Sequence, residues 1–261
     1  MWQSNTSGVT PSTPWLTLPK PNPKATLRLF CFPYAGGGPL IFRTWPDNLP
    51  NFVEVCPVQL PGRGQRLREP GITRVEVLIP KLAEALMPVF DKLFAFFGHS
   101  MGATVAFELS RYLRREHGVQ PVHLFASGSA APQLPDRHPR TYDQPETEFV
   151  ETLRRLKGTP QEVLENPELM QLIMPLLRAD FELAQTYAYT DEPPLNCPLS
   201  AFGGLQDTDI PREDIESWRE QTTASFTFRM LPGDHFFLLT EQRRILQLIF
   251  DTLTRLTRGG V

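Results

Sequence analysis

The chain has 261 residues, 41% of them hydrophobic, and this length is enough for one large domain with a sizeable buried core. Its 26 Lys and Arg residues nearly balance its 29 Asp and Glu residues, and the net charge of -3 excludes the basic field of a general nucleic-acid-binding protein. No apolar run approaches the roughly 20 residues that span a bilayer. The polar, proline-rich segment 1–24 is unlike a signal peptide, so we expect a cytoplasmic protein without membrane contact.

The cysteines do not indicate a metal or redox site. Cys31, Cys56 and Cys197 are odd in number, have no C-x-x-C spacing, and Cys31 and Cys56 have apolar neighbours. We therefore expect small buried hydrophobic residues, with neither a metal nor a bound cofactor.

Strands and helices alternate along most of the chain. Residues 1–26 are expected to be a flexible N-terminal segment outside the fold, and residues 27–261 to form the domain. Expected strands are 27–32, 52–58, 94–97, 121–126, 199–202 and 226–231. Expected helices are 42–49, which is short, 72–86, 103–115, 213–221 and 241–256. This alternation predicts an α/β fold, in which helices cover both faces of a mainly parallel central sheet.

The alternation stops between Gln144 and Tyr189. Three segments there, 149–156, 160–165 and 168–187, look helical with no strand between them. Insertions into such sheets commonly lie over the strand ends where active sites form, so we expect an inserted helical lid. The alternative is a plain helical hairpin that fills out one face of the sheet.

Residues 98–102, with the sequence GHSMG, fit the motif G-x-S-x-G. The motif follows an apolar strand and precedes a helix, which is the context of the nucleophile elbow of α/β-hydrolases. Gly98 and Gly102 let the backbone pass closely, and the helix N-terminus favours a developing oxyanion at Ser100. Ser100 is therefore the expected nucleophile. An ordinary turn with Ser100 as a helix N-cap is the alternative.

A serine hydroxyl needs a base, and the chain order Ser, Asp or Glu, His in this fold predicts a late histidine. His235 is the only histidine after His138, and it lies in a loop between a strand and the last helix. His99 is its main rival, but a position inside the elbow favours a pocket-wall or packing role. His117, His123 and His138 have no comparable context.

The acid that orients the histidine should follow the strand at 199–202. Asp207 and Asp209 both lie in that loop, with Asp214 further along the chain. We favour Asp207 as the acid and keep Asp209 as the alternative, while either residue could be a solvated turn aspartate.

Two backbone donors should bind the oxyanion, one after the nucleophile and one in the loop after an early strand. Met101 fills the first position, and Ala35 is the candidate for the second, with Gly36 next. The glycines at 36–38 could instead cradle a phosphate, but the loop contains neither a P-loop nor a G-x-G-x-x-G motif.

Together these residues resemble the type II thioesterases that accompany polyketide and nonribosomal peptide synthetases, a family related to the fatty-acid-releasing oleoyl-acyl-carrier-protein hydrolase. The resemblance extends over nearly everything after about Leu27. The matching segments are 32–37, 59–64, 98–102, 177–180, 203–204 with Asp207 and Trp218, and 233–237. It implies Ser100, Asp207 and His235 as the triad and Ala35 and Met101 as the oxyanion donors. Tyr34 departs from the His of many members, which affects the expected acyl preference.

The resemblance implies removal of stalled or misprimed acyl groups from the phosphopantetheine arm of acyl or peptidyl carrier proteins, in antibiotic biosynthesis. No cofactor is implied, and a monomer is expected. Arg63 or basic lid residues are hypothesised to dock the acidic carrier protein. The alternatives are a medium- or long-chain fatty acyl-carrier-protein hydrolase, a carboxylesterase and, in a different class, a non-catalytic acyl-binding module.

Overall fold

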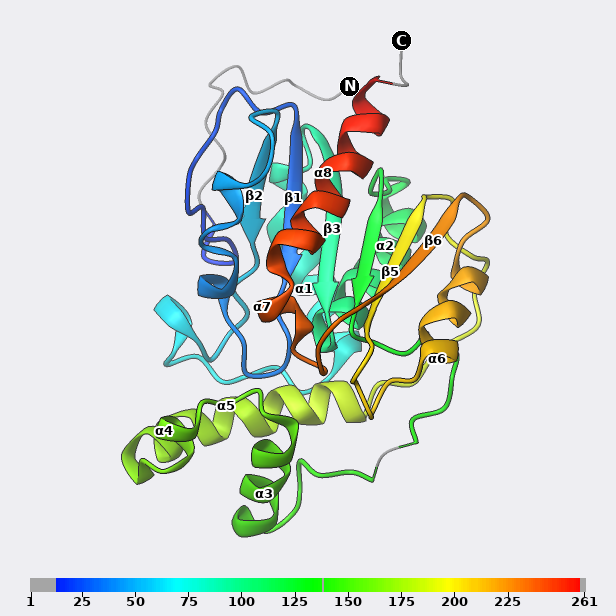
Figure 1. The fold of residues 1–261 in the computed structure, drawn as a ribbon. Coiled ribbons are helices and arrows are strands. Elements are labelled where there is room, and N and C mark those ends of the chain that lie inside the picture. Colours follow the sequence, from blue (N-terminus) through cyan, green and yellow to red (C-terminus); the bar gives the residue numbers. More distant parts are fainter. Residues whose placement is uncertain (1–12, 138, 259–261) are drawn as a thin grey trace.

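A parallel sheet forms the centre of the structure, a computed structural model that describes residues 13–137 and 139–258. Its strands are β1 (Leu27–Phe32), β2 (Val53–Pro57), β3 (Leu93–His99), β4 (Leu124–Ser127), β5 (Leu199–Gly204) and β6 (Phe226–Leu231). They lie in the order β2-β1-β3-β4-β5-β6, and each neighbouring pair is parallel (Figure 1). The expected α/β class with a mainly parallel sheet is confirmed.

The inner strands are apolar on both faces, because helices cover the sheet on both sides. In β1, Phe30 and Phe32 pack into one buried cluster, whereas Leu29 and Cys31 pack into the cluster on the opposite face. This alternation follows from the two-residue period of a strand. The three cysteines are buried and free, as expected.

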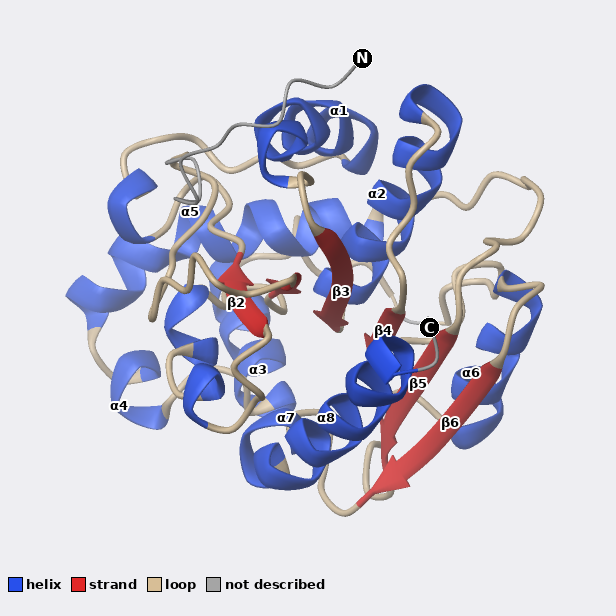
Figure 2. Cartoon of the chain, turned by 90° about the horizontal axis from the view of Figure 1, so that it is seen from above, coloured by secondary structure: helices blue, strands red, loops and turns tan. Residues whose placement is uncertain are grey.

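Helices form the outer layers (Figure 1, Figure 2). They are α1 (Val75–Leu86), α2 (Met101–His117), α6 (Arg212–Glu216), α7 (Phe237–Thr240) and α8 (Gln242–Arg258). Helices α1, α2 and α6 share a buried cluster with one face of the sheet, and α7 and α8 share another cluster with the opposite face. No helix in the described ranges is both long and apolar enough to cross a lipid bilayer.

The short helix expected at 42–49 is instead two 3-10 helices, Pro39–Phe42 and Trp45–Asp47. Pro46 has no N–H and therefore cannot donate the hydrogen bond that an α-helix requires at this position.

Residues 13–26, which were expected to lie outside the fold as part of a flexible segment, contact the domain in the structure; residues 1–12 lie outside the described residues. The N–H of Thr17 donates to the carbonyl of Pro57, and the carbonyl of Trp15 accepts from the N–H of Gln59. The guanidinium of Arg66 also lies 4.0 Å from the centre of the Trp15 ring. Strand β2 is an edge strand with unpaired backbone groups, and this segment covers that edge.

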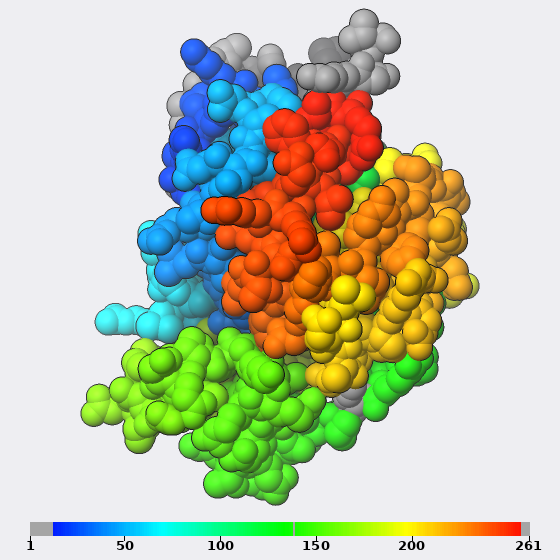
Figure 3. Space-filling model, in the orientation of Figure 1, coloured from blue at the N-terminus to red at the C-terminus, as the bar shows by residue number. Residues whose placement is uncertain are grey.

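The insertion forms three helices, α3 (Glu146–Leu156), α4 (Gln161–Leu164) and α5 (Pro167–Gln185). They lie across the carboxyl ends of the strands rather than on a face of the sheet (Figure 1). In the space-filling view they form a separate green layer at one end of the molecule (Figure 3). Phe149, Leu153, Met170 and Met174 form a small core between these helices. The position matches that expected for a lid, whose opening and closing stay a prediction.

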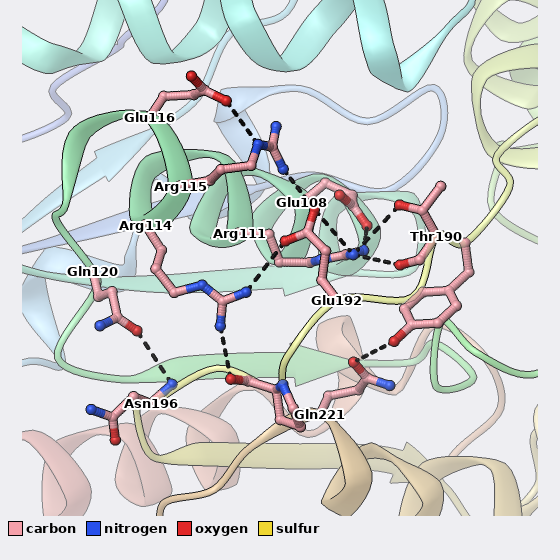
Figure 4. A network of polar contacts seen from close by, with 12 residues as sticks. Glu108, Arg111, Arg114, Arg115, Glu116, Gln120, Thr190, Glu192, Asn196 and Gln221 are labelled. Carbon is pink, nitrogen blue, oxygen red and sulfur yellow. Dashed lines mark hydrogen bonds and ion pairs between the residues drawn. The ribbon is translucent and has the colours of Figure 1, made fainter.

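The segment that leads from α5 back to the sheet is held against α2 by a network of polar contacts (Figure 4). At its centre, the buried Arg111 pairs with Glu108 at 2.7 Å and with Glu192 at 3.3 Å, and it donates to the carbonyl of Thr190. The hydroxyl of Tyr187 donates to Glu108 at 2.6 Å. The network thus anchors the end of the lid to the main domain.

Candidate active site

The order of the strands places the candidate site at one end of the sheet. From β1 the chain moves to β2 on one side, and it then crosses to β3 on the other side of β1. The loops that follow β1 and β3 therefore diverge and leave a crevice at the carboxyl ends of these strands, where ligands bind in such sheets. These two loops carry Ala35 and Ser100.

Ser100 occupies a strained turn between β3 and α2. Its φ is 54°, which is unusual for a residue other than glycine. A Cβ atom on Gly98 would lie 2.1 Å from the carbonyl oxygen of Gly102, and one on Gly102 would lie 2.2 Å from that of Phe32. The two glycines of the motif are therefore required by close backbone contact, as the sequence predicted.

The structure brings Ser100, His235 and Asp207 into one chain of hydrogen bonds. His235 Nε2 lies 3.0 Å from Ser100 Oγ, and His235 Nδ1 lies 2.8 Å from Asp207 Oδ2. The other carboxylate oxygen of Asp207 accepts from the N–H groups of Asp209 and Ile210. Burial alone would raise the pKa of Asp207, but the hydrogen bond and charge of His235, with these two N–H groups, lower it below its ordinary value.

The other acidic candidates point elsewhere. The carboxylate of Asp209 pairs with Arg155 of the lid at 3.2 Å, and that of Asp214 pairs with Arg137 at 3.1 Å. Neither is hydrogen-bonded to His235 in the described structure. The geometry therefore favours Asp207, and its role in catalysis remains a proposal.

His99 does more than line a pocket or pack. It is fully buried, and its Nδ1 lies 2.9 Å from Ser127 Oγ while its Nε2 lies 2.9 Å from the carbonyl oxygen of His235. Burial, and then the nearby charge of His235, lower the pKa of His99 to about 3. The ring is therefore neutral near pH 7. Sequence reasoning missed this contact because it joins residues 136 positions apart.

Two backbone N–H groups beside Ser100 are available for an oxyanion. Those of Ala35 and Met101 have no acceptor among the described residues. The N–H of Gly36, the second candidate in this loop, donates to Asp180 Oδ2 at 2.7 Å. The N–H of Gly36 is thus already hydrogen-bonded, and the geometry favours Ala35 as the second oxyanion donor.

Two cavities meet at Ser100 and His235. The larger, of about 510 Å³, lies between residues 128–137 and the segment 187–189, and its wall includes Thr104, Gln133 and Arg137. The smaller, of about 230 Å³, lies under the lid and is walled mainly by apolar groups. Its lining includes Tyr34, Leu156, Phe181, Ile210 and Phe236.

Of the two hypothesised docking groups, Arg63 does not fit the role, whereas docking by basic lid residues stays a prediction. The residue is only 5% exposed, and its guanidinium is paired with Asp180 at 2.6 Å, so it cannot reach a protein partner. Arg63 and Asp180 lie in two of the segments that carry the family resemblance, but their pairing joins distant parts of the chain and could not be inferred from either segment.

The described residues contain no group of three or more His, Cys, Asp or Glu side chains that could hold a metal ion.

The parallel sheet, the strained elbow at Ser100 and the late loop that carries His235 define an α/β-hydrolase. A family model described as the thioesterase domain matches residues 27–253. The chain belongs to this thioesterase family, and its relatives place it among the type II thioesterases of polyketide and nonribosomal peptide pathways. The resemblance stated from the sequence is confirmed, as is the assignment as an enzyme that acts on thioesters.

A relative from Brevibacillus parabrevis, named linear gramicidin dehydrogenase LgrE, is 51% identical over 248 residues, which cover 94% of each chain. The solved structure of RedJ, a thioesterase of the prodiginine pathway in Streptomyces coelicolor, is 41% identical with a TM-score of 0.82, over 87% of this chain and 85% of RedJ. BorB, the type II thioesterase of the borrelidin cluster, is 32% identical with a TM-score of 0.85, over 93% of this chain and 98% of BorB. The name of LgrE denotes a dehydrogenase, whereas the matched family and both solved structures are thioesterases.

Proposed function

We propose that this enzyme hydrolyses acyl thioesters on the phosphopantetheine arm of carrier proteins, and that it removes stalled or misprimed acyl groups from a polyketide or nonribosomal peptide synthetase. One observation carries the proposal. Ser100, hydrogen-bonded to His235, lies where a mixed polar cavity and a smaller apolar cavity meet. The proposed substrate has two matching parts, because its thioester joins a polar phosphopantetheine arm to an apolar acyl group.

In the acylation step, Ser100 Oγ attacks the thioester carbonyl while His235 Nε2 accepts the hydroxyl proton. Asp207, ionised and bound to Nδ1, keeps the imidazole oriented and stabilises its protonated form. The N–H groups of Ala35 and Met101 donate to the tetrahedral oxyanion. Collapse breaks the C–S bond, and the departing sulfur takes the proton from His235.

In the deacylation step, His235 removes a proton from water, which attacks the acyl-serine ester. The second tetrahedral intermediate uses the same two N–H donors, and His235 then returns the proton to Ser100 Oγ. The free acid leaves and the enzyme is restored. This scheme needs no metal or cofactor, because the phosphopantetheine belongs to the substrate.

The cavities support short acyl groups as substrates. The apolar cavity of about 230 Å³ is smaller than the ~300–1,000 Å³ common for sites that hold drug-sized ligands. Phe181 and Phe236 are bulky members of its wall. The larger cavity, with polar groups such as Gln133 and Arg137, suits the amide-containing arm.

Mass spectrometry of a carrier protein loaded with acetyl, butyryl, octanoyl or palmitoyl groups tests this proposal. We expect the wild type to remove the acetyl and butyryl masses fastest and Ser100→Ala to remove none. Ser217→Ala, which changes a serine outside both cavities, is the matched control and should act like the wild type. Preference for palmitoyl would indicate fatty-acid release. If the wild type removes none of the acyl groups, a carrier-protein substrate is refuted.

A further inference from the structure

A buried ion pair joins the lid to the loop that follows β2, and the same two side chains also bind the loop that follows β1. Arg63 lies in the loop after β2, Asp180 lies in α5, and their side chains are 6% and 2% exposed. Arg63 Nη2 lies 2.6 Å from Asp180 Oδ1, and Arg63 Nη1 lies 2.9 Å from Asp180 Oδ2. The contact is thus a two-pronged pair between a guanidinium and a carboxylate.

The same pair holds the backbone beside Ala35. Asp180 Oδ2 accepts from the N–H of Gly36 at 2.7 Å, and Arg63 Nη1 donates to the carbonyl of Gly37 at 2.7 Å. Asp180 therefore fixes the N–H of Gly36, and Arg63 fixes the carbonyl of Gly37, in the loop that follows β1.

These contacts select one form of a tight turn. The N–H of Gly37 donates to the carbonyl of Tyr34 at 2.8 Å, so Ala35 and Gly36 are the central residues of a β-turn. Gly36 has φ of 77°, which is typical of the third residue of a type II turn. If the central peptide flipped, the carbonyl of Ala35 would face the carboxylate of Asp180 in place of the N–H of Gly36, and the charges would repel.

The lid helix also packs directly on this turn. A Cβ atom on Gly36 would lie 2.5 Å from Leu177 Cδ2, so α5 touches the backbone of the loop itself. Leu177 and Asp180 are three positions apart and therefore lie on the same side of α5.

A gain in stability is a weak explanation for such a pair. The cost of removing two charges from water often equals or exceeds their attraction, and apolar residues of similar size can stabilise a fold equally well. An ion pair with fixed geometry does, however, orient the groups that it binds.

We propose that Arg63 and Asp180 are positioning residues that set the N–H of Ala35 for oxyanion binding, and that they do so only while α5 is seated. This inference rests on the proposed role of Ala35. It makes the oxyanion site a joint product of the lid and the main domain. A displaced α5 withdraws Asp180 from Gly36 and releases the turn, so hydrolysis is confined to the state in which the lid covers the acyl group.

Three variants test this proposal. Asp180→Asn keeps the shape of the side chain, but it removes the negative charge and one of the two acceptors, and its amide NH2 group then faces either Arg63 Nη2 or the N–H of Gly36, both of which are donors. Arg63→Lys keeps the charge but cannot hold both carboxylate oxygens and Gly37 together. Glu182→Gln is the matched control, because Glu182 pairs α5 with Arg74 at 2.6 Å without contacting the turn.

We expect Asp180→Asn to lower kcat on an acyl thioester by about 10- to 100-fold, a smaller loss than removal of a whole oxyanion donor, with KM within about twofold of the wild type. The inhibition constant of a trifluoromethyl ketone, whose adduct with Ser100 carries an oxyanion, should rise by a similar factor. Arg63→Lys should likewise lower kcat and raise the inhibition constant, and Glu182→Gln should change neither. A cooperative thermal unfolding curve shows that each variant is folded; if Asp180→Asn is not, Arg63→Lys carries the test.

Wild-type kcat in both Asp180→Asn and Arg63→Lys would overturn the proposal, as would an equal loss in Glu182→Gln or a rise in KM with kcat unchanged. The rate at which a fluorophosphonate labels Ser100 distinguishes failure of this positioning proposal from failure of the proposed function. If the wild type is labelled but leaves acyl carrier protein intact, the assumed substrate is wrong. The labelling rates of the variants then still decide whether Arg63 and Asp180 position the turn.

Discussion

His99 Nε2 lies 2.9 Å from the backbone carbonyl oxygen of His235. A carbonyl oxygen can only accept, so this nitrogen carries the proton, and the Ser127 hydroxyl donates to Nδ1 of the same ring. The residue before the proposed nucleophile therefore holds the backbone of the proposed base. A buried neutral imidazole suits this task, because it offers one donor and one acceptor.

Replacement of His99 by Phe should impair both stability and catalysis. The ring keeps a similar size, but the carbonyl of His235 and the hydroxyl of Ser127 lose their partner, which should cost about 1–3 kcal/mol of unfolding free energy. A shift of the His235 backbone should lower kcat by about 10- to 100-fold. Urea denaturation and steady-state kinetics measure the two effects. Ser127→Ala keeps the contact between His99 and His235, so its kcat should stay near that of the wild type; equal losses in both variants would contradict this role.

Two buried histidines should make the fold sensitive to mild acid. Burial is the main cause that lowers the pKa of His99 and of His123 from 6.5 to about 3. The unfolded chain binds these protons below about pH 6.5 and the native protein does not, so stability is present above that pH and is lost as the pH falls toward 3. Each histidine should contribute a loss of about 1.4 kcal/mol per pH unit in this window.

Urea denaturation between pH 7 and pH 4.5 measures this loss. In His123→Asn one of the two groups is gone, so the stability should fall less steeply with pH than in the wild type. His117→Asn is a matched control on the exposed end of α2. An unchanged slope in His123→Asn would show that His123 is not buried in its neutral form.

Asp207 and Asp209 should differ sharply when each is replaced by Asn. Asn at 207 presents an amide to Nδ1 of His235 and favours the wrong tautomer, and a change of this kind can lower kcat by about 10⁴-fold. Asp209 pairs with Arg155 at the surface of the lid, and its loss should change kcat by only a few-fold. Single-turnover hydrolysis with each variant distinguishes the two, and similar losses in both would reopen the choice of acid.

Local patterns were enough to predict the sheet, the elbow and the order of the candidate residues. The strand at 27–32 and the strand at 226–231 have the predicted bounds, because apolar runs between turn residues are a local signal. Ser100 was recognisable for the same reason, since the strand, the glycines and the helix adjoin one another in sequence.

Contacts between distant segments could not be predicted. Nothing near Trp15 in the sequence indicates that Arg66 lies against its ring, so residues 13–26 looked flexible. The basic side chain of Arg63 suggested a surface, because its partner Asp180 lies 117 positions away in the lid. The sequence shows which residues are charged, but the burial of each one depends on the segments that pack around it in the folded chain.

Arg111 should be important for stability, whereas its neighbour Arg115 should not. Arg111→Met removes the buried cation that joins Glu108, Glu192 and the carbonyl of Thr190, although Glu108 keeps the Tyr187 hydroxyl and Glu192 keeps Arg114 and Arg115, so the unfolding free energy should fall by about 1–3 kcal/mol. Arg115 also pairs with Glu192, but it is 48% exposed, so Arg115→Ala should cost about 1 kcal/mol or less. Denaturant unfolding of both variants checks the contrast, and equal effects would show that the network in Figure 4 is not the anchor of the lid.

The size of the apolar cavity should set the acyl preference, and Phe181 is the residue with which to change it. Its ring lines the cavity and meets Phe149 edge to face, with 5.2 Å between ring centres. Phe181→Ala lengthens the cavity, so the ratio of kcat/KM for octanoyl over acetyl carrier protein should rise about 10-fold or more. Leu172→Ala, which removes a 54% exposed side chain from the same helix, should leave this ratio unchanged. If Phe181→Ala lowers kcat/KM equally for both chains, the acyl group does not occupy this cavity, and the larger cavity becomes its binding site.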